Sequence, residues 1–252
     1  MKVVILAGGY GTRLSELTSS TPKPLVEING KPLIWYIMNL YSSYGFNDFI
    51  IACGYKEEKI MQYFADLPSI LNDFTVDVAN NKIDILNDRR PKWKVTLIDT
   101  GLDTMTGGRI KRLAKYIDSN TFMLTYGDGV SDVNLNDLLN FHRSHGKKAT
   151  ITAVRMPRWG VLNLEDNGKV ASFQEKRIDH SPFINGGFMV LSKEVVNYIK
   201  DDSEPFETYT MQKLTNEGEL YAFRHEGFWK AVDNIRDRQE LEEYYKLKFA
   251  TS

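Results

Sequence analysis

The chain has 252 residues, of which 42% are hydrophobic and 26% charged, as in globular proteins rather than disordered or fibrous ones. Its 32 basic and 33 acidic residues leave a net charge of −1, which argues against a nucleic-acid partner and a polybasic membrane anchor. One cysteine, Cys53, cannot form an intrachain disulfide, and its apolar neighbours indicate a buried small hydrophobe rather than a nucleophile. Without a signal-peptide core or a bilayer-length apolar run, the chain is expected in the cytoplasm, with no membrane partner.

The first half of the chain alternates between expected strands and helices. Residues 3–7 form a β-branched run ended by glycines, which is typical of a strand buried on both faces. Further strands are expected at 49–53, 95–99 and 121–126, and helices at 32–44, 57–64 and 109–116. This alternation is typical of a parallel sheet with helices on both faces. Residues 66–94 are less regular, and two short apolar alternations around Asn80-Asn81 predict a small hairpin or an oligomer contact.

The second half mixes shorter strands with helices. Strands are expected at 149–154, 161–164, 170–173, 188–191, 219–225 and 229–232, and helices at 135–145, 193–200, 207–217 and 236–249. Asn167-Gly168 is typical of a hairpin turn. His142 and His145 have no carboxylate or cysteine at ligand spacing, so we expect surface roles for both. With no repeat and no low-complexity linker, residues 1–252 are interpreted as one α/β domain.

The strongest local signal is the segment Gly8-Gly9-Tyr10-Gly11-Thr12-Arg13, which follows the first strand and precedes Pro22-Lys23-Pro24. Glycines let backbone N–H groups approach an anion closely, and Arg13 and Lys23 add two cations. The pattern matches neither the dinucleotide fingerprint nor the P-loop. It predicts a polyphosphate site. The alternative, a tight turn without a ligand, gives no reason for the two cations.

The sequence resembles the sugar-phosphate nucleotidylyltransferases. The motifs that carry the resemblance are Leu6–Leu14 with Pro22-Lys23-Pro24, Tyr126-Gly127-Asp128, Phe173-Gln174-Glu175-Lys176, Ile184-Asn185-Gly186-Gly187-Phe188, and Gly227-Phe228-Trp229 leading to Asp233. They follow the family's order across essentially the whole chain. Within the family, residues 100–109 resemble the segment typical of the glucose-1-phosphate cytidylyltransferase branch.

The resemblance implies a Rossmann-like nucleotidyltransferase fold of the α/β class, a mostly parallel mixed sheet flanked by helices, with smaller β excursions. Residues 1–130 would form a nucleotide-binding half and residues 131–252 a sugar-phosphate-binding half. The implied reaction joins CTP and α-D-glucose 1-phosphate into CDP-glucose and releases pyrophosphate. Members of the family tend to assemble, so a homo-oligomer, for example a hexamer, is expected.

The attacking phosphate oxygen is already ionised at neutral pH, so the chemistry needs positioning and charge stabilisation rather than a general base. By resemblance, the catalytic cations are Arg13, on the β- and γ-phosphates, and Lys23, between the α-phosphate and the sugar phosphate. Asp128 and Asp233 match the family's paired metal ligands, and carboxylate oxygens suit Mg²⁺. Without the resemblance, Asp128 would be read as a turn residue.

The nucleotide is expected to contact Leu6, Ala7, Gly8, Gly9, Tyr10, Gly11, Thr12, Arg13, Lys23, Thr104, Arg109 and Gly127. Cytosine presents acceptors at O2 and N3, whereas uracil carries a hydrogen on N3, so a guanidinium facing both atoms favours cytosine. Arg109 is the candidate for this contact, with Thr104 beside it. The alternative for Arg109 is a solvated charge at the start of a helix.

The sugar phosphate is expected to contact Trp159, Gly160, Glu175, Lys176, Asn185 and Gly186. Glu175 would accept hydrogen bonds from hexose hydroxyls, and Lys176 would pair with the phosphate. The sequence departs from the family here, because Arg177 replaces the usual proline and residues 157–160 replace the usual Gly-Arg-Phe-Gly. A different sugar phosphate or another small phosphate ester therefore stays open as the acceptor.

Two other functions stay open. One is a related enzyme that uses UTP or dTTP, against which the 100–109 segment argues. The other is a non-catalytic sensor or assembly subunit, which would typically lack one of the charged site residues, whereas all four, Arg13, Lys23, Asp128 and Asp233, are present.

Overall fold

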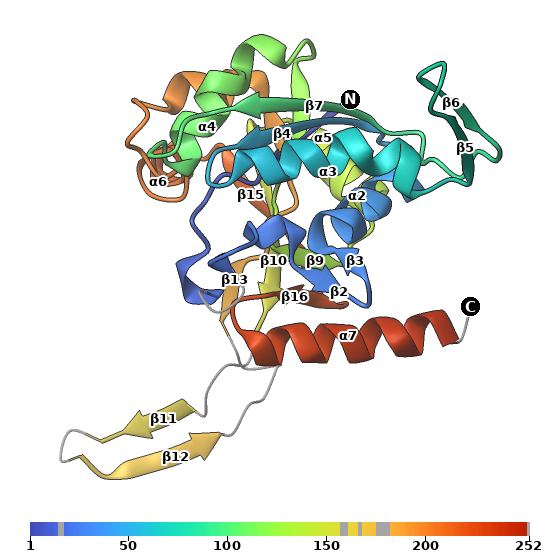
Figure 1. Cartoon of the computed structure of the whole chain (residues 1–252). Coiled ribbons are helices and arrows are strands. Elements are labelled where there is room, and N and C mark those ends of the chain that lie inside the picture. Colours follow the sequence, from blue (N-terminus) through green and yellow to red (C-terminus); the bar gives the residue numbers. More distant parts are fainter. Residues whose placement is uncertain (15–17, 157–160, 166–167, 175–181, 251–252) are drawn as a thin grey trace.

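The computed structural model describes residues 1–14, 18–156, 161–165, 168–174 and 182–250. An eight-stranded mixed sheet forms its centre (Figure 1). The strand order is β13-β10-β14-β8-β1-β4-β7, with β15 paired to β10. Its strands are β1 (Lys2–Leu6), β4 (Asp48–Cys53), β7 (Lys94–Asp99), β8 (Thr121–Tyr126), β10 (Ala149–Arg155), β13 (Phe183–Asn185), β14 (Met189–Ser192) and β15 (Leu220–His225). The expected mixed α/β sheet flanked by helices is confirmed.

Helices and short strand pairs surround the sheet. The α-helices are α2 (Leu33–Ser43), α3 (Glu57–Ile70), α4 (Thr106–Leu113), α5 (Leu135–His145), α6 (Tyr209–Asn216) and α7 (Ile235–Ala250). The 3₁₀ helices are η1 (Thr12–Leu14), η2 (Lys23–Leu25), η3 (Ala114–Tyr116) and η5 (Lys193–Tyr198). The pairs are β2 (Glu27–Ile28) with β3 (Lys31–Pro32), β5 (Phe74–Asp77) with β6 (Lys82–Ile85), β9 (Gly129–Ser131) with β16 (Trp229–Ala231), and β11 (Val161–Leu164) with β12 (Val170–Gln174).

The strand order places the nucleotide-binding motifs at one edge of the sheet. β1 pairs in parallel with β4 on one side and with β8 on the other, and β7 extends the parallel part beyond β4. The chain therefore builds outward from β1 to β7 and then returns to the opposite side of β1. In open α/β sheets, ligands bind at the carboxyl ends of the strands where the strand order reverses in this way. The glycine loop follows β1, and Asp128 follows β8.

Both faces of the central strands are buried. In β1, Val3 and Ile5 belong to the core that packs under α2 and α5, whereas Val4 and Leu6 belong to the core under α4 and α6. A strand covered on both faces has apolar residues in succession rather than alternation, which explains the apolar run after Lys2. Cys53 is fully buried in the first of these cores, and burial raises the pKa of its thiol to about 12, as expected for a hydrophobe rather than a nucleophile.

Three elements differ from their expected form. α4 begins at Thr106 rather than at Arg109, since Gly107 N donates to Glu204 O at 2.9 Å and fixes the helix start against a distant segment. α3 continues to Ile70, with Leu67 buried beneath it. Residues 193–198 form a 3₁₀ helix. Of the expected turn Asn167-Gly168, Asn167 lies outside the described residues, and Gly168 has a φ of +85°.

The expectation of a surface role is wrong for His142. α5 packs on β10, and this contact buries His142 to 7% exposure, with its Nδ1 2.9 Å from Thr150 Oγ1. His145 Nε2 lies 2.8 Å from the same hydroxyl. Two histidines and a threonine therefore join the end of α5 to the sheet.

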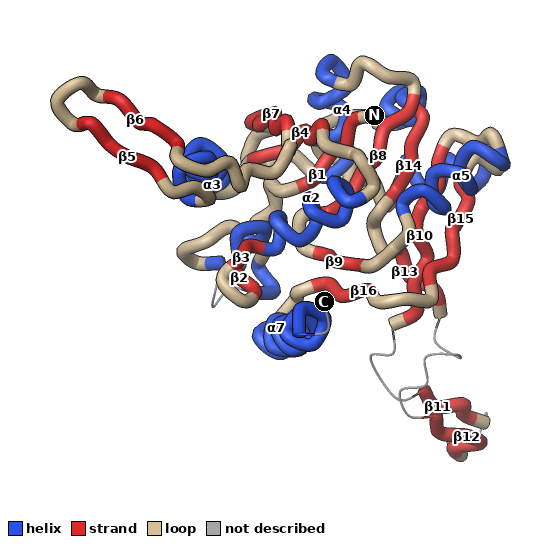
Figure 2. The backbone as a smooth tube through the Cα atoms, turned by 90° about the vertical axis from the view of Figure 1, so that its right-hand side faces the viewer, coloured by secondary structure: helices blue, strands red, loops and turns tan. Residues whose placement is uncertain are grey.

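The expected hairpin within residues 66–94 is confirmed as β5–β6, which projects from the body (Figure 2). Phe74 pairs with Ile85 and Val76 with Ile83, so these four side chains share one face of the hairpin. Between 37% and 55% of each residue is exposed. Among the helices that the structure describes, none has the length and apolar character needed to cross a membrane.

Candidate active site

A cavity of about 620 Å³ opens at the carboxyl ends of β1 and β8. Its lining comprises Leu6, Ala7, Gly8, Gly9, Tyr10, Gly11, Thr12, Lys23, Pro24, Leu102, Asp103, Thr104, Met105, Thr106, Arg109, Tyr126, Gly127, Asp128 and Asp233. The structure thus brings together the expected nucleotide-binding residues whose side chains it describes and both expected metal ligands. The backbone of Arg13 belongs to η1, whereas its side chain lies outside the described part.

The glycine loop forms one wall of this cavity. Gly11 has a φ of +65°, a conformation that favours glycine, and Thr18 Oγ1 donates to its carbonyl oxygen at 3.0 Å. Open space surrounds the position that a Cβ of Gly9 would take. Tyr10 donates its hydroxyl to Asp103 Oδ1 at 3.0 Å, and this hydrogen bond raises the pKa of Tyr10. The loop is therefore anchored at Tyr10 and Gly11, and residues 8–11 all line the cavity.

Lys23 lies between the two predicted metal ligands. Its Nζ donates to Asp128 Oδ2 at 2.6 Å and to Asp233 Oδ1 at 3.0 Å, and 11% of its side chain is exposed. Burial alone lowers the pKa of Lys23, but the charges and hydrogen bonds of the two carboxylates outweigh burial and raise it above the ordinary 10.5. The amine is therefore an ammonium at neutral pH. The flanking prolines, Pro22 and Pro24, restrict the backbone that carries it.

The donor set fits a hard divalent cation. Asp128 follows β8 and Asp233 follows β16, and the two carboxylates share the ammonium of Lys23. In the described part of the chain, no group of three or more His, Cys, Asp or Glu side chains is placed to hold a metal ion. Mg²⁺ commonly takes only one or two carboxylates and completes its shell with phosphate oxygens and water. The two aspartates that line the cavity match that requirement.

Arg109 lies at the floor of the cavity, 4% exposed. Its guanidinium donates to the carbonyl oxygens of Gly8 at 2.9 Å and Cys53 at 3.0 Å, among others. It is therefore a buried group rather than a solvated charge. Its predicted contact with cytosine stays a prediction, as does that of Thr104, which is 7% exposed and lines the same cavity.

Part of the expected sugar-binding set can be placed. Asn185 Nδ2 lies 3.4 Å from the hydroxyl of Tyr126, a cavity residue, and Gly186 is buried beside it. A Cβ on Gly186 would lie 2.9 Å from Val154 Cγ1, so a larger residue would not fit. The other four expected sugar-side residues lie outside the described residues: Trp159, Gly160, Glu175 and Lys176.

Sequence reasoning did not assign three polar residues around the cavity. Tyr126 donates to Glu207 Oε1 at 2.5 Å, and Thr106 donates to Glu207 Oε2 at 2.7 Å. Burial is the main reason that the pKa of Tyr126 is strongly raised, and the charge of Glu207 adds to it, so the phenol stays protonated. Tyr126 could have been found from its position at the end of a strand, directly before Gly127-Asp128. Glu207 carries no such local signal.

Comparisons with known proteins agree with this geometry. The model of the nucleotidyl transferase family matches residues 2–246. Glucose-1-phosphate cytidylyltransferase of Salmonella typhi is 49% identical over 96% of this chain and 95% of its own length. The probable glucose-1-phosphate cytidylyltransferase of Bacillus subtilis is 44% identical over 96% of this chain and 94% of its own length.

A solved structure shares the fold. The crystal structure of HddC from Yersinia pseudotuberculosis complexed with GMP-PN superposes with a TM-score of 0.73 at 26% sequence identity, over 97% of this chain and 99% of that one. Enzymes of this class generally use a divalent metal and act on nucleoside triphosphates and sugar phosphates. The matching model, the full-length relatives and the shared fold lead to one conclusion: the chain belongs to the nucleotidyl transferase family.

Proposed function

We propose that the protein transfers CMP from CTP to α-D-glucose 1-phosphate. A phosphate oxygen of the sugar phosphate forms a bond to the α-phosphorus of CTP, the bond from that phosphorus to the β-phosphate bridging oxygen breaks, and pyrophosphate leaves. The products are CDP-glucose and pyrophosphate. One observation carries the proposal: the glycine loop, Lys23, Asp128 and Asp233 line a single cavity. Close relatives named for this reaction support the choice of substrates.

The cavity can accommodate the charges of this reaction. In the proposal, backbone N–H groups of Gly8–Gly11 bind the triphosphate, and Arg13 stabilises the departing pyrophosphate. Lys23, already charged beside two carboxylates, attracts the incoming sugar phosphate towards the α-phosphate. Asp128 and Asp233 would hold Mg²⁺, which supplies positive charge to phosphate oxygens. A general base is unnecessary, because the attacking oxygen carries no proton at neutral pH.

The two ends of the substrates are assigned to different parts of the chain. We place the base near Thr104 and Arg109, at the opposite side of the glycine loop from Asp128. Glucose is placed near Asn185 and Gly186, and with them Trp159, Gly160, Glu175 and Lys176. In this arrangement residues 1–130 serve the nucleotide and residues 131–252 the sugar phosphate. The proposed setting is the cytoplasm, where CTP is available.

Pyrophosphate release measured with a matrix of nucleotides and sugar phosphates tests the proposal. The matrix contains CTP, UTP, dTTP and GTP against the 1-phosphates of glucose, galactose, mannose and glucosamine. We expect the highest kcat/KM for CTP with glucose 1-phosphate. A preference for UTP or dTTP would contradict the cytidylyl assignment, a preference for another sugar would contradict the acceptor, and no release with any pair would favour a non-catalytic protein.

We also propose that the protein assembles into a homo-oligomer through β5–β6, with a hexamer as the expected size. Phe74, Val76, Ile83 and Ile85 form an exposed apolar face, and polar residues occupy the other face of the hairpin. An isolated two-stranded hairpin is marginally stable in water, so a covered face would stabilise it. A second copy of the chain provides a matching apolar surface by symmetry.

A further inference from the structure

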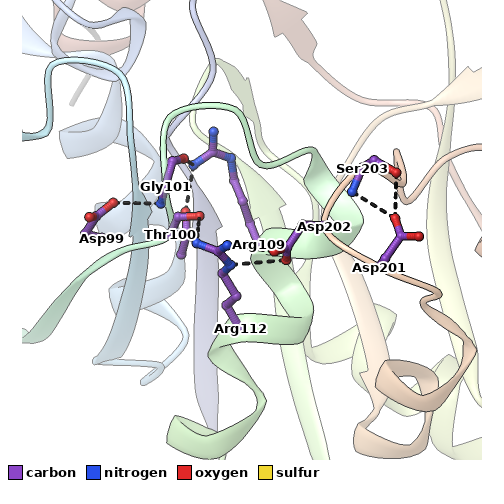
Figure 3. A network of polar contacts seen from close by, with 8 residues as sticks. All are labelled: Asp99, Thr100, Gly101, Arg109, Arg112, Asp201, Asp202 and Ser203. Atoms are coloured by element: carbon purple, nitrogen blue, oxygen red, sulfur yellow. Dashed lines mark hydrogen bonds and ion pairs between the residues drawn. The ribbon is translucent and has the colours of Figure 1, made fainter.

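The guanidinium of Arg109 joins three separate parts of the chain: Gly8, Cys53 and residues 100–102. Nη1 donates to Cys53 O at 3.0 Å, to Thr100 Oγ1 at 2.7 Å and to Gly101 O at 2.8 Å. Nη2 donates to Gly8 O at 2.9 Å and to Leu102 O at 3.2 Å. Each acceptor is a backbone carbonyl or a threonine hydroxyl. Figure 3 shows the side chain pointing towards Thr100 and Gly101.

The glycine loop and the end of β4 are shaped around this group. A Cβ on Gly8 would collide with Nη1 of Arg109, and a Cβ on Gly54 would lie 2.5 Å from the same atom. Neither glycine has a positive φ, so close approach rather than backbone conformation requires glycine there. The guanidinium thus occupies the space beneath the loop, and the carbonyl oxygen of Gly8 accepts a hydrogen bond from it.

Neighbouring contacts fix the helix that carries Arg109. A Cβ on Gly108 would lie 2.5 Å from Asp202 Cα, and Met105 N donates to Asp202 O at 2.8 Å. Arg112, one turn away on α4, donates to Asp202 Oδ2 at 2.6 Å and to Thr100 O at 3.0 Å (Figure 3). Contacts from Met105, Gly108 and Arg112 therefore hold α4 between the turn after β7 and residues near 202.

We infer that Arg109 is a positioning residue for the glycine loop. By bonding Gly8 O to the ends of β4 and β7, it orients the following N–H groups towards the triphosphate. The four Nη hydrogens are already shared among five acceptors, so reading cytosine with them would require breaking contacts that hold the loop. The preference for CTP over UTP therefore does not depend on a direct contact from either Nη group. The inference rests on the proposed function only for its kinetic readouts.

The test compares Arg109→Lys with the matched control Arg112→Lys, which loses contacts with Thr100 and Asp202 but none with Gly8. Amide hydrogen exchange of the peptide spanning Gly8–Leu14, followed by mass spectrometry, reports loop order without relying on activity. We expect exchange about tenfold faster in Arg109→Lys, because local opening becomes easier, and near wild type in Arg112→Lys. Unchanged loop exchange in Arg109→Lys would overturn the inference.

Steady-state kinetics distinguishes a role of Arg109 in positioning the glycine loop from direct recognition of the base and from a loss of folded protein. For Arg109→Lys we expect kcat/KM for CTP to fall about 100-fold, the cost of a misplacement of about 1 Å, through a higher KM for CTP. KM for glucose 1-phosphate stays unchanged, whereas a smaller folded fraction would lower kcat and leave both KM values unchanged. The ratio of kcat/KM for CTP to that for UTP should stay within about twofold, because both carry the same triphosphate. Collapse of that ratio would overturn the inference.

A milder variant covers the case in which Arg109→Lys does not fold. Thr100→Val is nearly isosteric and removes the hydroxyl that accepts from Arg109. For Thr100→Val we expect smaller changes in the same direction in the amide exchange of the loop and in kcat/KM and KM for CTP. Faster exchange of the loop again supports the inference, and unchanged exchange overturns it. If the wild-type protein releases no pyrophosphate from CTP, the proposed function fails, whereas the exchange experiment still decides the role of Arg109.

Discussion

In the free protein the ammonium of Lys23 holds Asp128 and Asp233 together. In Lys23→Met the two carboxylates would lose the ammonium that they share, and we expect a loss of about 2 kcal/mol of stability, less than for a fully buried pair because Asp128 is partly exposed. Mg²⁺ should raise the melting temperature more in the variant than in the wild type. Turnover should fall about 10²- to 10³-fold. Equal Mg²⁺ effects on both proteins would contradict the placement of the metal.

The hydroxyl of Tyr126 links the nucleotide cavity to Asn185 and Glu207. We expect Tyr126→Phe to raise KM for glucose 1-phosphate about tenfold, the usual effect of losing one hydrogen bond, with KM for CTP unchanged. Initial rates with one substrate varied at a time measure both constants. Thr215→Val, which removes a hydroxyl bonded to Met211 O on α6, is a control outside the cavity. A rise in KM for CTP alone would place Tyr126 at the nucleotide.

The contact between α5 and β10 makes stability depend on pH. Burial, followed by the charges of His145 and Arg143, lowers the pKa of His142 to about 4 from an ordinary 6.5. As pH falls, His142 therefore takes up a proton in the unfolded chain before it does so in the folded protein. The stability that the neutral, buried His142 contributes is fully present above pH 6.5 and is lost as pH falls towards 4, by about 3 kcal/mol. Urea unfolding between pH 7 and 4 measures it, and His142→Gln should flatten the profile. The same slope in both proteins would contradict the assignment.

The hairpin β5–β6 has one apolar face that the rest of the described chain leaves exposed. If this face joins copies of the chain, Val76→Asp combined with Ile83→Asp should reduce the molar mass measured by light scattering. The free energy of unfolding of each monomer should stay within about 1 kcal/mol of the wild-type value, because both side chains are already exposed. Leu247→Asp, at a 71% exposed residue of α7, is the matched control. An unchanged mass in the hairpin variant would move the interface elsewhere.

Across the whole molecule, the features that could be predicted from the sequence are those that depend on residues close together in the chain. The glycine loop and Asp128 stand directly after buried strands, so the strand pattern locates them at the ligand-binding edge of a parallel sheet. The hairpin β5–β6 could also be predicted, from the alternation of apolar and polar residues. This alternation predicts an apolar face, but it does not predict which surface packs against that face.

Contacts between distant segments could not be derived in the same way. Lys23 meets Asp233 across 210 residues. Only the family resemblance assigned both residues to the site, and it did not predict the contact between them. Tyr126 and Glu207 lie 81 residues apart, and no local pattern marks Glu207. The five acceptors of Arg109 depend on how α4 packs between β4, β7 and residues near 202, which periodicity does not specify.

The location of the nucleotide tests the central claim most directly. A crystal structure of the protein with CTP and Mg²⁺ should show the triphosphate within hydrogen-bond distance of backbone N–H groups in Gly8–Gly11, with Asp128 and Asp233 ligating the metal. CTP bound away from the glycine loop, or a metal held by neither aspartate, would contradict the account.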